Sequence, residues 1–151
     1  MPRREAIAAA AQDWLHRGAV DLAMARKAMR DPADIDPWAV AFHAQQAAEK
    51  AIKAALVVEQ VRIPRVHELE RLVLLLPKDW ALPDVAELAR LSRYAIAGRY
   101  PSGGIDTEPG PDWDDADRAL RLADRVVAAV RDGIARRGLG TTDHREVSDD
   151  A

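Results

Sequence analysis

The fold is decided by residues 36–56, whose sequence is DPWAVAFHAQQAAEKAIKAAL. Asp36 is a favoured N-cap residue, and Pro37 follows at the first helical position, where its missing N–H costs nothing. Apolar side chains then recur every three or four residues to the end of the segment, which is the spacing of one helix face. Gln45 and Glu49 are polar residues on that face. The segment therefore predicts a helix whose packing surface contains a polar pair.

The same spacing of apolar side chains continues before and after this segment. It predicts further helices over about residues 3–30, 67–76, 82–97 and 112–136. Gly18, inside the first of these, either weakens that helix or admits a close neighbour. The last helix has clear boundary signals, because Asp112 is a favoured N-cap residue and Gly138 follows two arginines. The sequence thus predicts five helices and no sheet.

Two other segments have the composition of irregular chain. Residues 98–111 contain four glycines and three prolines, which excludes both a helix and a central strand. The tail from Thr141 to Ala151 contains four acidic residues and one arginine, with too few apolar side chains to pack. We therefore predict one helical domain, residues 1–138, followed by a disordered acidic tail, residues 139–151.

Composition excludes several classes of function. The chain has no cysteine, which rules out disulfides, thiolate metal sites and cysteine nucleophiles. No two histidines have the spacing of metal ligands, and we expect neither a metal nor another cofactor. The net charge of −3 equals that of the tail, so the helical domain is neutral and is no general polyanion binder, although it can hold a local basic cleft. Since no signal peptide or membrane span is predicted, we expect a cytoplasmic protein.

Three sequence blocks, in this order along the chain, indicate a family. They are AFHAQQAAEKAIKA at residues 41–54, HELERL at residues 67–72 and YAIAGRYP at residues 94–101. Together they resemble the HEPN domain family, and the resemblance extends over about residues 10–135. It implies an all-α fold, an up-and-down bundle of four to five helices that usually forms a two-fold homodimer.

The HEPN family includes partners of minimal nucleotidyltransferases, ribonucleases of toxin systems, and modules that bind nucleotides or RNA. Its ribonucleases carry an arginine followed, after four to six residues, by a histidine on a helix at the dimer groove. Arg62 with His67, and Arg137 with His144, have this spacing, but a chain so rich in arginine gives such matches by chance. Neither pair lies where the ribonuclease motif belongs.

The resemblance therefore favours a non-catalytic or weakly catalytic homodimeric module of a prokaryotic cytoplasm. It would bind nucleotide or RNA and work with a minimal nucleotidyltransferase partner in a toxin–antitoxin-like system. One alternative is a metal-independent ribonuclease toxin, in which His67 would be the general acid/base and Arg99 would stabilise the phosphate. A second alternative is a purely structural dimerisation module.

A candidate ligand site follows from the predicted order of the helices. In an antiparallel bundle, we expect the end of the second helix, the start of the third and the end of the fourth to lie at one end. The predicted ligand-binding residues there are Glu49, Lys53, His67, Arg99 and Tyr100. Three potential cations beside a glycine-rich loop indicate a local anion site, since a guanidinium group binds oxyanions through two hydrogen bonds.

Some of these residues also have a purely structural interpretation. Glu49 and Gln45 can form a satisfied pair between helices or at a dimer interface. Arg99 can cap its own helix, or it can pair with Glu49 or Glu59 across the bundle. His67 can be a connector or capping residue at the start of the third helix.

The lysines and aromatic residues of the first two helices have structural interpretations as well. Lys50 and Lys53 lie on the polar side of the second helix and can simply belong to a solvated face. Trp14, Trp38 and Phe42 fit the core or an interface better than a platform for stacking bases.

Overall fold

The computed structural model describes residues 2–97 and 110–140 of the 151-residue chain. These residues form α1 (Pro2–Arg30), α2 (Pro37–Val58), α3 (Leu69–Val73), a 3₁₀ helix η1 (Lys78–Trp80), α4 (Val85–Ala97) and α5 (Trp113–Arg136). The two described ranges contain no strand, which confirms the all-α prediction. Within them, no helix combines the length and the apolar character that crossing a membrane requires. The tail from residue 141 and most of the glycine-rich segment, residues 98–109, lie outside the described residues.

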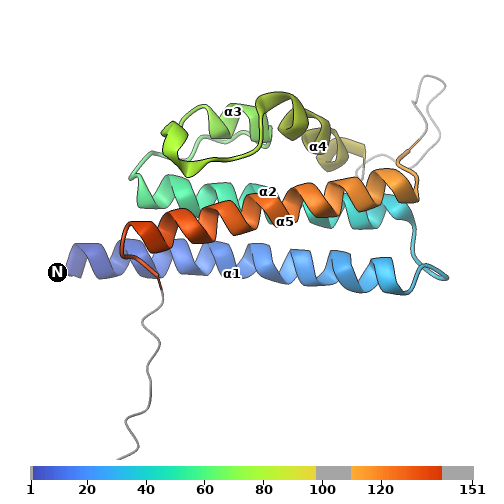
Figure 1. The fold of residues 1–151 in the computed structure, drawn as a ribbon, viewed down its shortest axis with the longest axis horizontal. Coiled ribbons are helices and arrows are strands. Elements are labelled where there is room, and N and C mark those ends of the chain that lie inside the picture. The colour runs from blue at the N-terminus through green and yellow to red at the C-terminus, as the bar shows by residue number, and fades with distance from the viewer. Residues whose placement is uncertain (1, 98–109, 141–151) are drawn as a thin grey trace, which may run out of the picture.

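The long helices alternate in direction along one axis of the molecule (Figure 1). α1 and α2 are antiparallel neighbours, and α5 packs against both of them. α3, η1 and α4 form a further layer over α2, in which α4 runs in the direction of α1. This arrangement confirms the up-and-down bundle.

α2 is the central helix of the bundle. It packs against α1, α3, α4 and α5, and every one of its residues from Ala39 to Val58 is buried or half-buried. The approach of α1 depends on Gly18, because a Cβ atom there would lie 3.0 Å from the carbonyl oxygen of Ala47. Gly18 therefore admits a close neighbour, which is one of the two roles expected for it.

The predicted helix boundaries at Asp36, Asp112 and Gly138 are confirmed. The carboxylate of Asp36 accepts a hydrogen bond from the backbone N–H of Trp38 at 3.1 Å, and that of Asp112 accepts one from Asp115 at 2.7 Å. The Asp115 carboxylate in turn accepts from the backbone N–H of Asp112, which completes a capping box. Gly138 has a φ of 68° just beyond α5, a conformation that glycine adopts without steric cost.

The third helix is much shorter than the predicted span of residues 67–76. It begins only at Leu69, whose backbone N–H donates to the hydroxyl of Ser92 in α4 at 2.8 Å, while Glu68 before it is extended. It ends at Val73, and the chain then passes through turns to Pro77 and η1. The run of leucines had the spacing of a helix, but Leu74 is 71% exposed and contributes little to packing.

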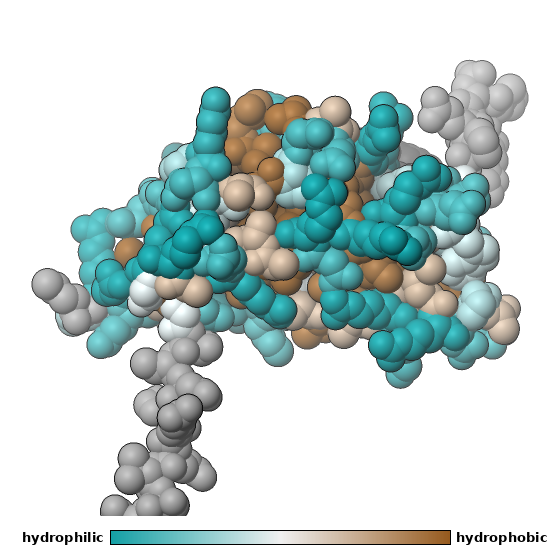
Figure 2. Space-filling model, in the orientation of Figure 1, coloured by the Kyte–Doolittle hydropathy of each residue, from teal (hydrophilic) through white to brown (hydrophobic). Residues whose placement is uncertain are grey.

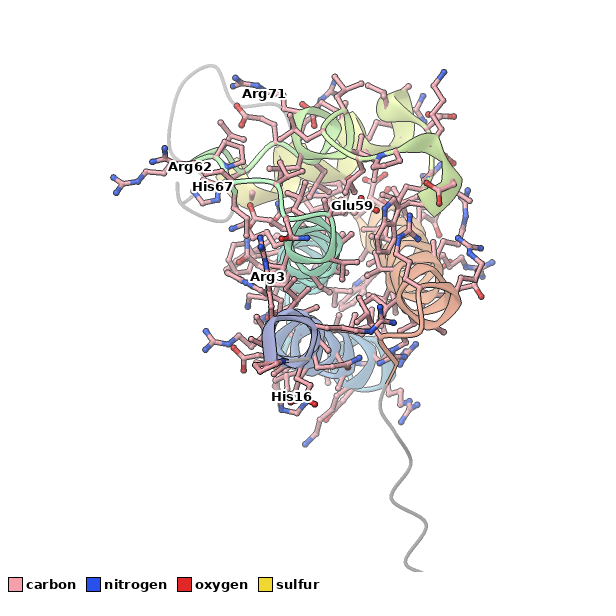
Figure 3. The ribbon with its side chains drawn as sticks, turned by 90° about the vertical axis from the view of Figure 1, so that its left-hand side faces the viewer. Arg3, His16, Glu59, Arg62, His67 and Arg71 are labelled. Atoms are coloured by element: carbon pink, nitrogen blue, oxygen red, sulfur yellow. The ribbon has the colours of Figure 1, made fainter. Side chains whose placement is uncertain are left out.

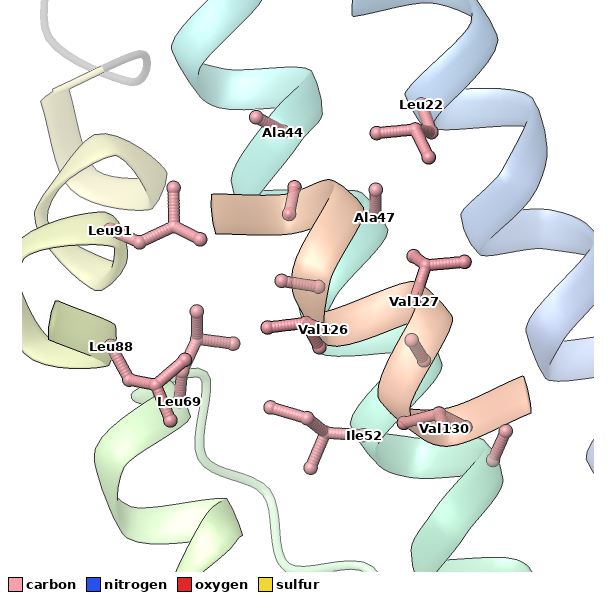
Figure 4. Close-up of a cluster of buried hydrophobic side chains, with 14 of the residues drawn as sticks. Leu22, Ala44, Ala47, Ile52, Leu69, Leu88, Leu91, Val126, Val127 and Val130 are labelled. Carbon is pink, nitrogen blue, oxygen red and sulfur yellow. The ribbon is translucent and has the colours of Figure 1, made fainter. Parts of the chain in front are cut away.

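The hydrophobic core surrounds α2 and contains side chains of α1, α3, α4 and α5 (Figure 4). Ile52 of α2, Leu88 and Leu91 of α4, Leu69 of α3 and Val126 of α5 all belong to this core and are fully buried. Burying a side chain of this size contributes about 1.5–3 kcal/mol to folding. This core holds α2 in place and thereby fixes the side chains that α2 presents on its other sides.

Candidate functional site

Two buried carboxylates on the α1–α2 side of the molecule each hold one lysine and one histidine. The first group, here called the Glu49 cluster, consists of Glu49, Lys53 and His67. The Glu49 side chain is only 5% exposed, and its two oxygens lie 2.8 Å from Nδ1 of His67 and 3.5 Å from Nζ of Lys53. Lys53 also lies over the ring of Trp14, 5.2 Å from its centroid, which favours the ammonium ion further. The lysine is therefore held from two sides and is only 14% exposed.

His67 is oriented with one nitrogen inward and the other available. A carboxylate has only acceptor atoms, so Nδ1 of His67 donates the hydrogen bond to Glu49. Nε2 is then the nitrogen open to a ligand, on a side chain that is 58% exposed. Figure 3 shows His67 and the exposed Arg62 together on the side of α2 that faces away from α5.

The second group, the Asp21 cluster, consists of Asp21 of α1 with His43 and Lys50 of α2. Asp21 is 7% exposed, and its oxygens contact Nδ1 of His43 at 3.0 Å and Nζ of Lys50. The histidine again uses Nδ1 toward the carboxylate. His43 also packs edge-on against Phe42, whose ring in turn meets Trp38.

A chain of amide hydrogen bonds runs along α2 near both clusters. Gln45 donates to the backbone carbonyl of His67 at 3.4 Å, and Gln46 donates to the side-chain oxygen of Gln45 at 2.7 Å. His43, Lys50 and Lys53 recur on α2 at the spacing of one helix face. Both clusters therefore belong to one polar face of the central helix, here called the α2 polar face.

The predicted site residues on α2 and His67 are brought together, but for a different reason than expected. Residues 59–68 run back along α2, and this path places His67 beside Glu49. α4 ends over the N-terminal half of α2, so the expected meeting of helix ends is wrong (Figure 1). Arg99 and Tyr100, and the histidine of the Arg137–His144 pair, lie outside the described residues.

Several structural interpretations can now be decided. Lys50 and Lys53 do not form a solvated face, because each pairs with a buried carboxylate. Glu49 pairs with His67 and Lys53, and not with Gln45. His67 is a connector residue, since the N-cap position of α3 is occupied by Glu68.

The structure also places the three aromatic residues of the first two helices, and it shows which groups pair with Glu59. Trp14 and Phe42 are half-buried, and Trp38 is 41% exposed, so none of the three lies fully in the core. Glu59 accepts hydrogen bonds from the indole of Trp80 at 2.8 Å and from Arg137 at 3.0 Å. Both carboxylates suggested as partners for Arg99 therefore have partners within the described part of the chain.

Asp21 was not found by sequence reasoning. The sequence signal that could have indicated it is its position in α1. Asp21 lies three residues after Gly18 and one before Leu22, on the face by which α1 packs against α2. A carboxylate at such a position requires partners, and α2 offers His43 and Lys50 opposite it.

The α2 polar face presents two histidines, each held at Nδ1 by a buried carboxylate. Nε2 of a histidine whose Nδ1 is held by a carboxylate can accept or donate a proton. Among the described residues, no group of three histidine, aspartate or glutamate side chains is arranged to hold a metal ion.

The layering of helices around the enclosed α2 places the chain among all-α bundles. The comparisons make the assignment specific: the chain belongs to the HEPN domain family, whose model matches residues 11–133. TT1696 from Thermus thermophilus is similar in structure, with 27% identity and a TM-score of 0.64 over 81% of this chain and 96% of that one. ST0689, an archaeal HEPN homologue, has 26% identity and a TM-score of 0.64 over 82% of this chain and 97% of its own. A comparison with curated proteins finds no significant match.

Proposed function

We propose that this chain is a cytoplasmic HEPN module that binds nucleotide or RNA and works with a minimal nucleotidyltransferase in a toxin–antitoxin-like system. Membership of the HEPN family supports this proposal. A gene for a small nucleotidyltransferase beside the gene for this chain, and copurification of the two proteins, would test the partnership. A nucleotidyltransferase from that locus that neither copurifies nor binds would contradict it.

The observation that carries the binding proposal is the orientation of the two histidines on the α2 polar face. Each is held at Nδ1 by a buried carboxylate, so each offers Nε2 toward a ligand. Lys50 and Lys53 offset the charge of those carboxylates, and the exposed Arg62 lies on the same side as His67. A phosphate group contacting this face would meet guanidinium donors and, where the histidine rings are protonated, imidazolium donors, without facing an unpaired carboxylate.

Arg99 and Tyr100 are proposed to extend the same face. They follow α4, and α4 ends over the half of α2 that carries His43. In this proposal Glu49 positions His67 and Lys53 and does not contact the ligand.

The binding test is a titration of nucleotides and short single-stranded RNA against the wild type and the variants His67→Ala, Arg99→Ala and Lys53→Ala at several salt concentrations. We expect His67→Ala and Arg99→Ala each to weaken binding about tenfold, which corresponds to about 1.4 kcal/mol. Wild-type affinity should fall with salt, because phosphate contacts release counterions.

The matched control is His16→Ala. His16 is an exposed histidine of α1, and Figure 3 shows it on the outer side of that helix, away from His67. Its removal should leave affinity unchanged. Weak, salt-insensitive binding that is equal in all variants would dispose of the site.

The pairing of His67 with Glu49 also favours a second candidate function, a metal-independent endoribonuclease. Here Nε2 of His67 would transfer the proton, and Arg99 would stabilise the phosphate in the transition state. Cleavage of bulk RNA in the presence of EDTA, abolished by His67→Ala, would support it. Intact RNA after incubation with micromolar protein would exclude it.

We further propose that the chain is a homodimer, which is also what a purely structural module would need. Val20 and Met24 lie one turn apart on α1 and are 47% and 48% exposed, and Trp38 at the start of α2 is 41% exposed. Sedimentation equilibrium should give twice the monomer mass of 16.6 kDa, and Val20→Glu with Met24→Glu should give the monomer. Leu74→Glu, at a more exposed leucine after α3, is the control that should remain dimeric.

A further inference from the structure

A cavity separate from the α2 polar face lies between α4 and α5. α4 packs mainly on α2 and α3 and contacts α5 sparingly, so a cleft of about 440 Å³ remains between the two helices. Its apolar wall consists of Leu91 of α4 with Ala119 and Leu122 of α5. Figure 2 shows apolar surface between the hydrophilic side chains of these helices. No residue of the Glu49 or Asp21 clusters lines this cleft.

Four arginines surround the apolar wall: Arg90, Arg118, Arg121 and Arg125. Three of them form ion pairs with carboxylates, at 3.3 Å to Asp115, 2.8 Å to Asp117 and 3.1 Å to Glu87. These three arginine side chains are 58–77% exposed, and ion pairs in such surroundings contribute only about 0–1 kcal/mol.

The guanidinium groups can therefore exchange their carboxylate partners for a ligand at little cost. Arg90 has no carboxylate partner among the described residues, and it lies on α4 opposite the arginines of α5. With Asp117, the partner of Arg121, counted beside the lining residues Glu87 and Asp115, four guanidinium groups face three carboxylates. The cleft is thus positively charged although the helical domain as a whole is neutral.

Tyr94 adds a hydrogen-bond donor to the same cleft. Its side chain is half-buried, and burial raises the pKa of Tyr94, with a further contribution from the carboxylate of Asp115. The hydroxyl group therefore stays protonated at neutral pH and can donate to an anion, while the ring adds aromatic surface to the wall.

We propose that the α4–α5 cleft is a binding site for a small organic anion, with an apolar or aromatic body against Leu91 and Leu122 and a phosphate or carboxylate group among the arginines. The volume lies within the range of about 300–1,000 Å³ that small-molecule pockets occupy. The cleft fits a ligand with one charged end and one flat end. The arginines and the hydroxyl donor would contact the charged end, and the apolar wall would contact the flat end.

The test uses the full chain and four probes: 1-naphthyl phosphate, 1-naphthoate, uncharged 1-naphthol and inorganic phosphate. Binding is measured by calorimetry and located by the shifts of backbone amides in ¹H–¹⁵N spectra. We expect the two naphthyl anions to bind and to shift amides of residues 87–94 and 115–125. The stronger of the two identifies phosphate or carboxylate as the preferred group, and the two reference probes should bind at least about tenfold more weakly.

Two variants separate the charged and the apolar contributions. Arg90→Ala with Arg118→Ala should weaken both naphthyl anions about tenfold or more, whereas Leu122→Ala should weaken them without removing charge. The matched control is Arg131→Ala, since Arg131 is an exposed arginine of α5 that does not line the cleft. Thermal melts verify that every variant is folded.

The proposal is overturned if 1-naphthol binds as well as the anions, or if the arginine variants bind like Arg131→Ala. It is also overturned if no probe binds at millimolar concentration, or if the shifted amides belong to His67 and Lys53. The last result would assign the anion to the α2 polar face and leave the proposed function standing, so the two failures are distinguishable.

Discussion

The arrangement around Glu49 concentrates several functions in one carboxylate. Its side chain orients the His67 ring, neutralises Lys53 and is almost inaccessible to water. When one of the two oxygens of a buried carboxylate is replaced by an NH2 group, one of its donors is left without an acceptor, and that loss costs more than the net strength of the original hydrogen bond.

Glu49→Gln should therefore destabilise the protein and release His67. We expect the free energy of unfolding to fall by about 1–3 kcal/mol, measured by urea denaturation, because the amide cannot satisfy both the ammonium and the imidazole. The matched control is Glu68→Gln, at a glutamate of the following connector whose side chain is 45% exposed. Equal stability of the two variants would show that the Glu49 contacts contribute nothing net.

Gly133 provides a second test at the scale of one residue. In an isolated helix, alanine in place of glycine adds about 1 kcal/mol of stability. Here the new Cβ would lie 2.3 Å from the ring of Trp80, which is 1% exposed and fully enclosed. The clash dominates, and we expect Gly133→Ala to destabilise by about 1–3 kcal/mol. Gly110→Ala, with no described residue within 4 Å of the added atom, should be nearly neutral in the same thermal melts.

Part of the candidate site could be predicted from single residues. Glu49, Lys53 and His67 were grouped through an expected meeting of helix ends, whereas the structure brings them together through the path of residues 59–68 along α2. Asp21 could not be placed in the same way, because pairing with His43 depends on the register between two helices, which sequence spacing within one helix does not contain.

At the scale of whole elements, helix ends were more predictable than helix lengths. The N-caps at Asp36 and Asp112 depend only on residues close by in the sequence, and they lie where the sequence predicts them. α3 was predicted too long because its extent is set by contacts with α4, among them the hydrogen bond between Leu69 and Ser92. The cleft between α4 and α5 could not be predicted from the sequence either, because its size depends on how far apart the two helices lie in the folded chain.

The capping box of α5 makes the stability of this element depend on pH. The backbone N–H of Asp115 donates to Asp112 and lowers the pKa of Asp112 below its ordinary value of 3.8. Because the pKa in the folded state lies below that of the unfolded chain, ionised Asp112 stabilises the fold above about pH 3.8. That contribution is lost as the pH falls through the lower, folded-state pKa.

Asp112→Ala should therefore lower the melting temperature at pH 7, and the difference from the wild type should shrink below pH 3.8. Circular dichroism melts across this pH range provide the measurement. Asp117→Ala, which removes an exposed pair with Arg121 within the same helix, is the control and should change little. A difference that stays constant down to about pH 2 would contradict the assigned role of the charge.

At the scale of the whole molecule, stability should be distributed around α2. This helix contacts four other helices, whereas α3 has five residues and is followed by two exposed leucines. In native-state hydrogen exchange, we expect the amides of α2 to open only with global unfolding and those of α3 to open through smaller fluctuations. The denaturant dependence of each amide distinguishes these routes. Equal protection in α2 and α3 would mean that the bundle opens only as one unit.

The enclosure of α2 also limits how such a protein can evolve. Ala44, Ala47 and Ala51 are completely buried between neighbouring helices, so a larger side chain at any of them would force those helices apart. The connector of residues 59–68 has no fully buried residue, although Val61, Ile63 and Val66 pack against the core, and one of the two histidine–carboxylate pairs depends on it through His67. A change in the position of His67 is therefore accommodated more easily by substitutions in this connector than by substitutions in α2.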